Sequence, residues 1–177
     1  MPDKAKFKAL IHYVCAQAPS LLSLGATKLN KILWFAERDC YLRGEPLSQV
    51  PFIKLQLGPV PSGMENYLDE LQSDGILKIR DTEWRGKPKR EFISLVDPNL
   101  EGFSRSQISL INLAIQSICL GQTAKSISDI SHDEVWELAR IGEEIPYYAA
   151  FGKRGEIGEE DIVWASQQLR ELSMEAP

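Results

Sequence analysis

Residues 28–48 read KLNKILWFAERDCYLRGEPLS and residues 52–75 read FIKLQLGPVPSGMENYLDELQSDG, and these two stretches decide the fold. The first predicts a helix over about 27–43, because its apolar residues recur at helical spacing. One face carries Leu29, Ile32, Leu33, Ala36 and Cys40, and other faces carry Trp34, Phe35, Tyr41 and Leu42. A helix that is apolar on nearly all sides is usually central, so we expect this one to lie in the middle of the core. Gly44 should end it as a C′ glycine.

A strand, a corner and a second helix are predicted between residues 50 and 75. The run VPFIKLQL at 50–57 favours a strand, and GPVP at 58–61 favours a rigid corner because two prolines fix φ and donate no hydrogen bond. Ser62 followed by Glu65 matches a capping box, so we expect Ser62 to cap a helix that ends at Gly75. The buried stripe of this helix should consist of Met64, Tyr67, Leu68 and Leu71.

The next segment predicts a β-hairpin. Strands at Ile76–Arg80 and Glu91–Val96 flank the basic loop DTEWRGKPKR, whose glycine and proline favour a flexible tip. Helix, turn, helix and hairpin in this order are typical of a winged-helix unit. The first half of the chain is therefore expected to have a winged-helix-like order of elements.

The remaining pattern is helical. A first helix is predicted over about Asp3–Gln17, and capping boxes are predicted at Ser104 with Gln107 and at Ser131 with Glu134. A short helix is expected at 145–151 and a last one at about 159–172. The fold class is mainly α with a small β-hairpin (α+β). We expect a single domain over residues 1–177 with a core at about 27–151.

Composition indicates a globular protein of the cytoplasm. The chain has 177 residues, of which 44% are hydrophobic and 25% are charged. No apolar run approaches the roughly 20 residues that cross a bilayer, and the N-terminal pattern is not that of a signal peptide. The three cysteines are widely spaced among apolar residues, which favours buried, reduced thiols.

Charge is distributed unevenly, and this bears on nucleic-acid binding. Residues 1–44 and 78–90 each carry a net +4, whereas residues 129–177 carry −8. This asymmetry suits the steering of a charged macromolecule, although solvated helix faces explain it equally well. The basic hairpin tip could grip phosphate, but the helix in the recognition position holds four acidic residues and no basic one. DNA reading is therefore disfavoured.

The sequence shows no assembled catalytic group. His12 lies in an apolar helix, which favours a structural role. Ser131, His132, Asp133 and Glu134 are adjacent at a predicted helix start and point in different directions, so capping explains them better than catalysis does. The two histidines and three cysteines have no zinc spacing, and phosphate-loop and dinucleotide motifs are absent from the sequence. We predict no catalytic residue, no cofactor and no metal.

The motifs themselves resemble a known family. The Lys-Leu-x-Lys pattern at Lys28, Leu29 and Lys31, the GPVP segment at 58–61, and Ser131-His132 with Trp136 are similar to the Panacea domain, also called the SocA-like antitoxin domain. The resemblance extends over about 27–151, with Trp34 and Leu57 where the family tends to have tyrosine. It implies an antitoxin that neutralises a cognate toxin, encoded nearby, by direct protein–protein binding. It also implies an alternative role, a proteolytic adaptor that delivers a toxin to an AAA+ protease. A DNA-binding autorepressor stays open as a rival hypothesis of another class.

Residues expected to be exposed are our candidates for contact with such a partner. Trp34, His132, Leu29 and Trp136 are instead expected to determine the fold, because apolar helix faces are usually core. The candidate contact residues are Gln56, Gly58 and Pro59 at the predicted corner, Trp84 and Arg85 on the hairpin tip, and Tyr147.

Overall fold

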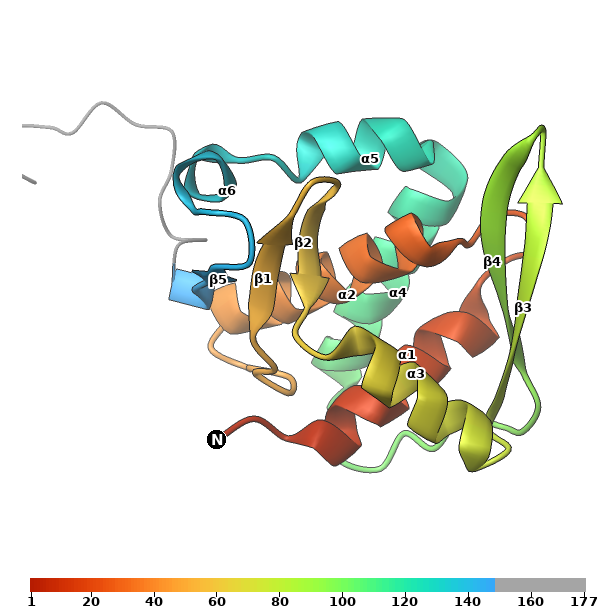
Figure 1. The fold of residues 1–177 in the computed structure, drawn as a ribbon. Helices are drawn as coiled ribbons and strands as arrows, with labels where there is room; N and C mark the ends of the chain where they lie inside the picture. The colour runs from red at the N-terminus through yellow and green to blue at the C-terminus, as the bar shows by residue number, and fades with distance from the viewer. Residues whose placement is uncertain (149–177) are drawn as a thin grey trace, which may run out of the picture.

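The computed structural model describes residues 1–148, except for the side chain of Glu134. Within that range the chain is mainly helical with small antiparallel sheets, so the predicted α+β class is confirmed (Figure 1). The helices are α1 (Lys4–Gln17), α2 (Ala26–Leu42), α3 (Met64–Ser73), α4 (Arg105–Gly121), α5 (Ala124–Ile130) and α6 (Glu134–Leu138). The strands are β1 (Phe52–Leu55), β2 (Gly58–Pro61), β3 (Leu77–Trp84), β4 (Lys87–Ser94) and β5 (Glu144–Ile145).

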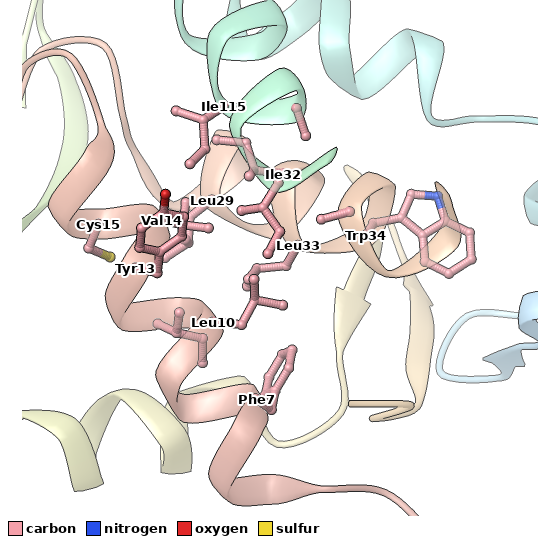
Figure 2. Close-up of a cluster of buried hydrophobic side chains, with 14 of the residues drawn as sticks. Phe7, Leu10, Tyr13, Val14, Cys15, Leu29, Ile32, Leu33, Trp34 and Ile115 are labelled. Atoms are coloured by element: carbon pink, nitrogen blue, oxygen red, sulfur yellow. The ribbon is translucent and has the colours of Figure 1, made fainter. Parts of the chain in front are cut away.

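Helix α2 is the central element, as its apolar pattern predicts. It packs against α1, α4, α5 and the β1–β2 hairpin. Figure 2 shows Leu29, Ile32 and Leu33 of α2 between side chains of α1 and Ile115 of α4. The C-terminal end is also confirmed, because Gly44 adopts φ +73 just past the helix and its N–H bonds the Tyr41 carbonyl.

Two buried polar side chains fasten neighbouring segments to the helical core. Glu37 of α2 accepts hydrogen bonds from the backbone and hydroxyl of Ser48 and from the Gln49 N–H, which holds the segment after α2 against the helix. Burial raises the pKa of Glu37 to about 7. His12 Nε2 lies 2.8 Å from Ser94 Oγ. His12 is buried and bonds β4, which is consistent with the structural role predicted for it.

The GPVP segment is a strand, so the predicted rigid corner is wrong. It forms β2 and pairs antiparallel with β1, with Phe52 opposite Pro61 and Leu55 opposite Gly58. Strand β5 pairs with the other side of β1, which leaves β2 at the edge of the three-stranded sheet. Proline is compatible with an edge strand when its missing N–H faces away from the neighbour. The chain turns earlier than predicted, at Gln56 and Leu57.

Two of the three predicted capping boxes are also wrong. Helix α3 begins after Gly63 at φ +72 without a side-chain cap, while the Ser62 N–H donates to the Pro51 carbonyl. Ser131 ends α5, and Asp133 caps α6. The box at Ser104 and Gln107 is confirmed. The buried stripe of α3 is confirmed as well, with Met64, Tyr67, Leu68 and Leu71 all buried.

The β3–β4 hairpin is longer and its loop shorter than predicted. Its strands pair from Leu77 opposite Ser94 to Trp84 opposite Lys87. Arg85 and Gly86 alone form the turn, at φ +51 and +73, which suits the twist of a two-residue hairpin. The hairpin stands at one side of the molecule, beside the N-terminal end of α2 (Figure 1). The winged-helix arrangement stays a prediction.

Other sequence predictions have mixed outcomes. Cys15, Cys40 and Cys119 are buried and free, as predicted. Among the described residues, none of the helices is long and apolar enough to span a bilayer. The segment after Pro146 begins a short helical turn at Tyr147 and Tyr148, and the remainder of that predicted helix lies outside the described residues. The predicted helix at 159–172 also lies outside them.

Candidate partner-binding surface

The motif residues of three distant segments meet at Lys31 of α2. Lys31 is only 1% exposed, and its Nζ donates a 2.9 Å hydrogen bond to the Pro59 carbonyl. A Cβ placed on Gly58 would lie 2.6 Å from that Nζ and 2.3 Å from Ser131 Oγ, so only glycine fits between them. Burial lowers the pKa of Lys31 to about 7. Lys31 thus ties the β1–β2 hairpin to the central helix, and Gly58 lets the end of α5 approach the hairpin closely.

A stacked cluster supports the hairpin from the side of α6. The rings of His132 and Trp136 stack with centroids 3.6 Å apart and planes 5° apart. Lys54 Nζ lies 4.0 Å from the Trp136 ring centroid and donates to the carbonyls of Glu137 and Ala139. Burial, followed by the nearby charge of Lys31, lowers the pKa of His132. This cluster fixes α6 against β1.

The arrangement around Ser131 lacks the geometry of a nucleophile and its base. Ser131 Oγ donates 2.7 Å to the Ser128 carbonyl within its own helix turn. Burial raises the pKa of the Cys40 thiol to about 12, and it raises that of Cys15 as well, so neither thiol is activated. Over residues 1–148 there is also no group of three metal-binding side chains. The geometry therefore favours a structural scaffold over a reaction centre.

A groove lies over this scaffold, between α2 and the end of the β1–β2 hairpin. We name it the hairpin groove; its volume is about 560 Å³, and its lining includes Asn30, Lys31, Leu55, Gln56, Leu57 and Ile141. Leu57 is 60% exposed and Ile141 is 63% exposed, so apolar side chains form an open rim. A smaller hollow of about 280 Å³, beside Ile53 and Met64, continues it and shares Asn30 and Leu55. Exposed apolar side chains grouped around a concave surface are typical of a protein-binding site.

One polar atom in the groove has no partner. Asn30 Oδ1 is buried and accepts no hydrogen bond from any described residue. An unsatisfied buried acceptor costs about 1–3 kcal/mol. The exposed polar groups of the groove are supplied instead by Gln56 and Glu65, which lie beside its apolar rim.

The structure separates the predicted contact residues. Gln56 lines the groove and is exposed. Trp84 is 47% exposed, and Arg85 is exposed beside it, with its guanidinium carbon 5.5 Å from the ring centroid. Gly58 and Pro59 are buried, because Lys31 and Ser131 pack against them, so the expectation that they are exposed is wrong.

Tyr147 also departs from its expected exposure. It is half-buried, its ring stacks on Trp34 and Tyr41, and its hydroxyl donates 2.5 Å to the Val50 carbonyl. Burial raises its pKa. Its contacts make it a structural anchor for the segment that follows β5.

Two apolar residues of the groove were missed by sequence reasoning. Leu57 follows Gln56 in the turn between β1 and β2, and a leucine on each side of a polar turn residue could have indicated an apolar tip. Ile141 lies in the loop before β5, and the sequence around it gives no comparable indication of an exposed apolar residue. Of the predicted fold determinants, Leu29 and Trp34 are buried, whereas His132 and Trp136 are half-buried.

Comparison with known proteins identifies the family. The family model described as antitoxin SocA-like, Panacea domain, matches residues 29–137, which is more than half of the chain. Neither a curated protein nor a solved structure matches the chain. The matched range contains Lys31, the β1–β2 hairpin and the stacked His132–Trp136 pair. The chain belongs to the SocA-like antitoxin family and carries its Panacea domain.

Proposed function

We propose that this protein is a cytoplasmic antitoxin that neutralises a cognate toxin by direct binding, and that the hairpin groove is the docking surface. The observation that carries the proposal is the groove itself, an open hollow with an apolar rim that lies mostly within the residues matched by the family model. The protein acts by covering part of the toxin, and it performs no reaction of its own.

The scaffold under the groove gives the surface a fixed shape. Lys31 and the Lys54–Trp136 contact hold the hairpin from both sides, so binding does not need to order it. A preorganised surface loses less conformational entropy on binding, which improves affinity. The hollow accommodates a few apolar side chains of a toxin segment beside the exposed side chain of Gln56. Such anchors near the centre of an interface carry most of its binding energy.

Two other roles are compatible with toxin binding to different extents. A proteolytic adaptor would use the same docking step and add delivery to an AAA+ protease. A DNA-binding autorepressor fits less well, because α3 carries acidic residues and no basic one where a recognition helix should be basic. Two of those acidic residues, Glu65 and Glu70, pair with Arg90 and Lys8 of other segments.

Co-expression with the product of the adjacent open reading frame tests the proposal. Growth rescue together with co-purification of the two proteins is the expected result. Leu57→Asp should abolish both, because a carboxylate would be buried against the toxin. Leu120→Asp is the matched control, since Leu120 is also a well-exposed leucine, on α4 and outside the groove lining.

The outcomes separate the alternatives. Rescue and co-purification that survive Leu57→Asp would overturn the docking surface. Rescue by the wild type without any complex would overturn neutralisation by contact. Rescue that requires an intact AAA+ protease in the host, with a complex still formed, would identify the adaptor role.

A further inference from the structure

A second groove lies between β4 and the N-terminal ends of α2 and α5. We name it the basic groove; its volume is about 460 Å³, and four basic residues line it: Lys28, Lys87, Lys89 and Arg90. Trp84 forms part of its wall, and none of its lining residues is acidic. The hairpin and the start of α2 that enclose it lie side by side in Figure 1.

Two of the four cations have no carboxylate partner. Lys87 makes no ion pair with any described residue, and Lys28 Nζ donates only to the Cys119 carbonyl, at 3.2 Å. Burial lowers the pKa of Lys28, because a partly buried ammonium group is less well solvated. A negative group in the groove would compensate for that loss of hydration.

The other two cations have structural partners. Arg90 forms ion pairs with Glu65 at 2.8 Å and with Asp81 at 3.5 Å. Lys89 Nζ donates to the Leu21 carbonyl. These contacts fix β4 against α3 and the loop before α2, so the groove has a rigid wall.

The first turn of α2 adds to the positive potential. Gly25 occupies its N-cap position and supplies no side-chain acceptor, so the first N–H groups of this 17-residue helix are free of a side-chain cap. Ala26 and Thr27 of that turn line both the basic groove and the hairpin groove. The two grooves are therefore parts of one continuous surface.

We propose that the basic groove binds an acidic polypeptide segment of the same toxin whose apolar side chains enter the hairpin groove. This inference rests on the proposed function and adds the chemistry of the partner: an apolar element followed closely by Asp and Glu residues. Charge complementarity is the argument for this occupant. Nucleic acid is the competing polyanion, and the experiment below separates it from an acidic polypeptide.

Charge reversal at the two unpaired lysines tests the inference. The Lys28→Glu/Lys87→Glu double variant should bind the co-expressed toxin about tenfold or more weakly than the wild type, with a smaller dependence on salt. Lys78→Glu is the control, because Lys78 is exposed on β3 of the same hairpin and does not line the groove. Binding is measured by titration of the purified toxin at 50 and 300 mM salt.

Each result decides a different point. If the toxin binds the double variant and the control equally well, the acidic-segment inference is wrong while the antitoxin function stands. If the toxin binds neither the wild type nor any variant, the proposed function fails.

A labelled 15-residue Glu-Leu peptide tests the basic groove alone. Binding of the peptide that the double variant loses supports the inference, and tighter binding of a 15-nucleotide single strand overturns it.

Discussion

Gly58 lies so close to Lys31 that a Cβ on residue 58 would be 2.6 Å from the ammonium nitrogen. Gly58→Ala must therefore displace a buried lysine and also adopt φ +100, so it should lower the free energy of unfolding by about 2 kcal/mol or more. Gly44→Ala is the control, because Gly44 has φ +73 with no atom within 4 Å and should cost only about 1 kcal/mol. Urea unfolding measures both; equal losses would contradict the packing argument.

Burial of Lys31 should make stability depend on pH. The folded protein holds the pKa of Lys31 at about 7, below its usual value of 10.5, so the unfolded chain binds more protons between these two pH values. Stability should then rise as pH increases from 7 to 9.5, by roughly 2 kcal/mol from this group. Lys31→Met should lose that rise, whereas Lys4→Met removes an exposed lysine as a control. Parallel pH profiles for wild type and Lys31→Met would refute the assignment.

The contact between Glu37 and Ser48 should be measurable by a single substitution. Ser48→Ala removes the hydroxyl donor from a buried carboxyl, so we expect unfolding to become easier by about 1–3 kcal/mol. Ser73→Ala, at an exposed position of α3, should have little effect. Denaturant melts of both variants test this, and a neutral Ser48→Ala would show that the backbone N–H donors suffice.

Tyr147 offers a test of its structural role. Tyr147→Phe keeps the ring contacts with Trp34 and Tyr41 but loses the hydrogen bond to the Val50 carbonyl, for an expected cost of about 1 kcal/mol. The toxin affinity of the folded variant should not change. A large loss of affinity without a loss of stability would return Tyr147 to the list of contact residues.

Two of the three serines predicted as helix caps, Ser104 and Ser62, should differ in their effect. Ser104→Ala should destabilise the protein by about 1 kcal/mol, because Ser104 accepts from the Gln107 N–H. Ser62→Ala should be close to neutral, because α3 has no side-chain cap. Thermal unfolding of the two variants compares them directly, and similar shifts in Tm would contradict the observed caps.

The sequence predicted the helical framework well and the hairpins less well. The apolar pattern of α2 and the position of Gly44 are local properties, so its location and its end could be predicted. The Ser-x-x-Glu capping pattern is short, so it also occurs where no cap forms. The Ser62 N–H bonds the Pro51 carbonyl instead, and Ser131 ends α5, so neither serine begins a helix. Polar strands such as β3 lack the alternation that identifies a half-buried strand, which explains why the length of the hairpin was underestimated.

The candidate surface could be predicted only in part. Lysine is normally exposed, so nothing in the sequence indicated that Lys31 is buried under β2 or that it excludes Gly58 and Pro59 from the surface. Gln56 and Trp84 are exposed as expected, because residues in or beside a hairpin turn stay exposed whatever the tertiary packing. The hairpin groove depends on Ile141, more than eighty residues further along the chain, and such long-range neighbours leave no local pattern.

The position of Pro59 and Pro61 in β2 has a consequence for how specificity can change. Half of this short edge strand lacks an N–H, so a foreign chain cannot extend the sheet by adding a strand there. If the hairpin groove is the docking surface, as we propose, recognition depends on side-chain shape and charge at positions such as Gln56 and Leu57. The residues at those positions can be substituted in evolution without altering the backbone beneath them, so one scaffold can be adapted to bind unrelated toxins.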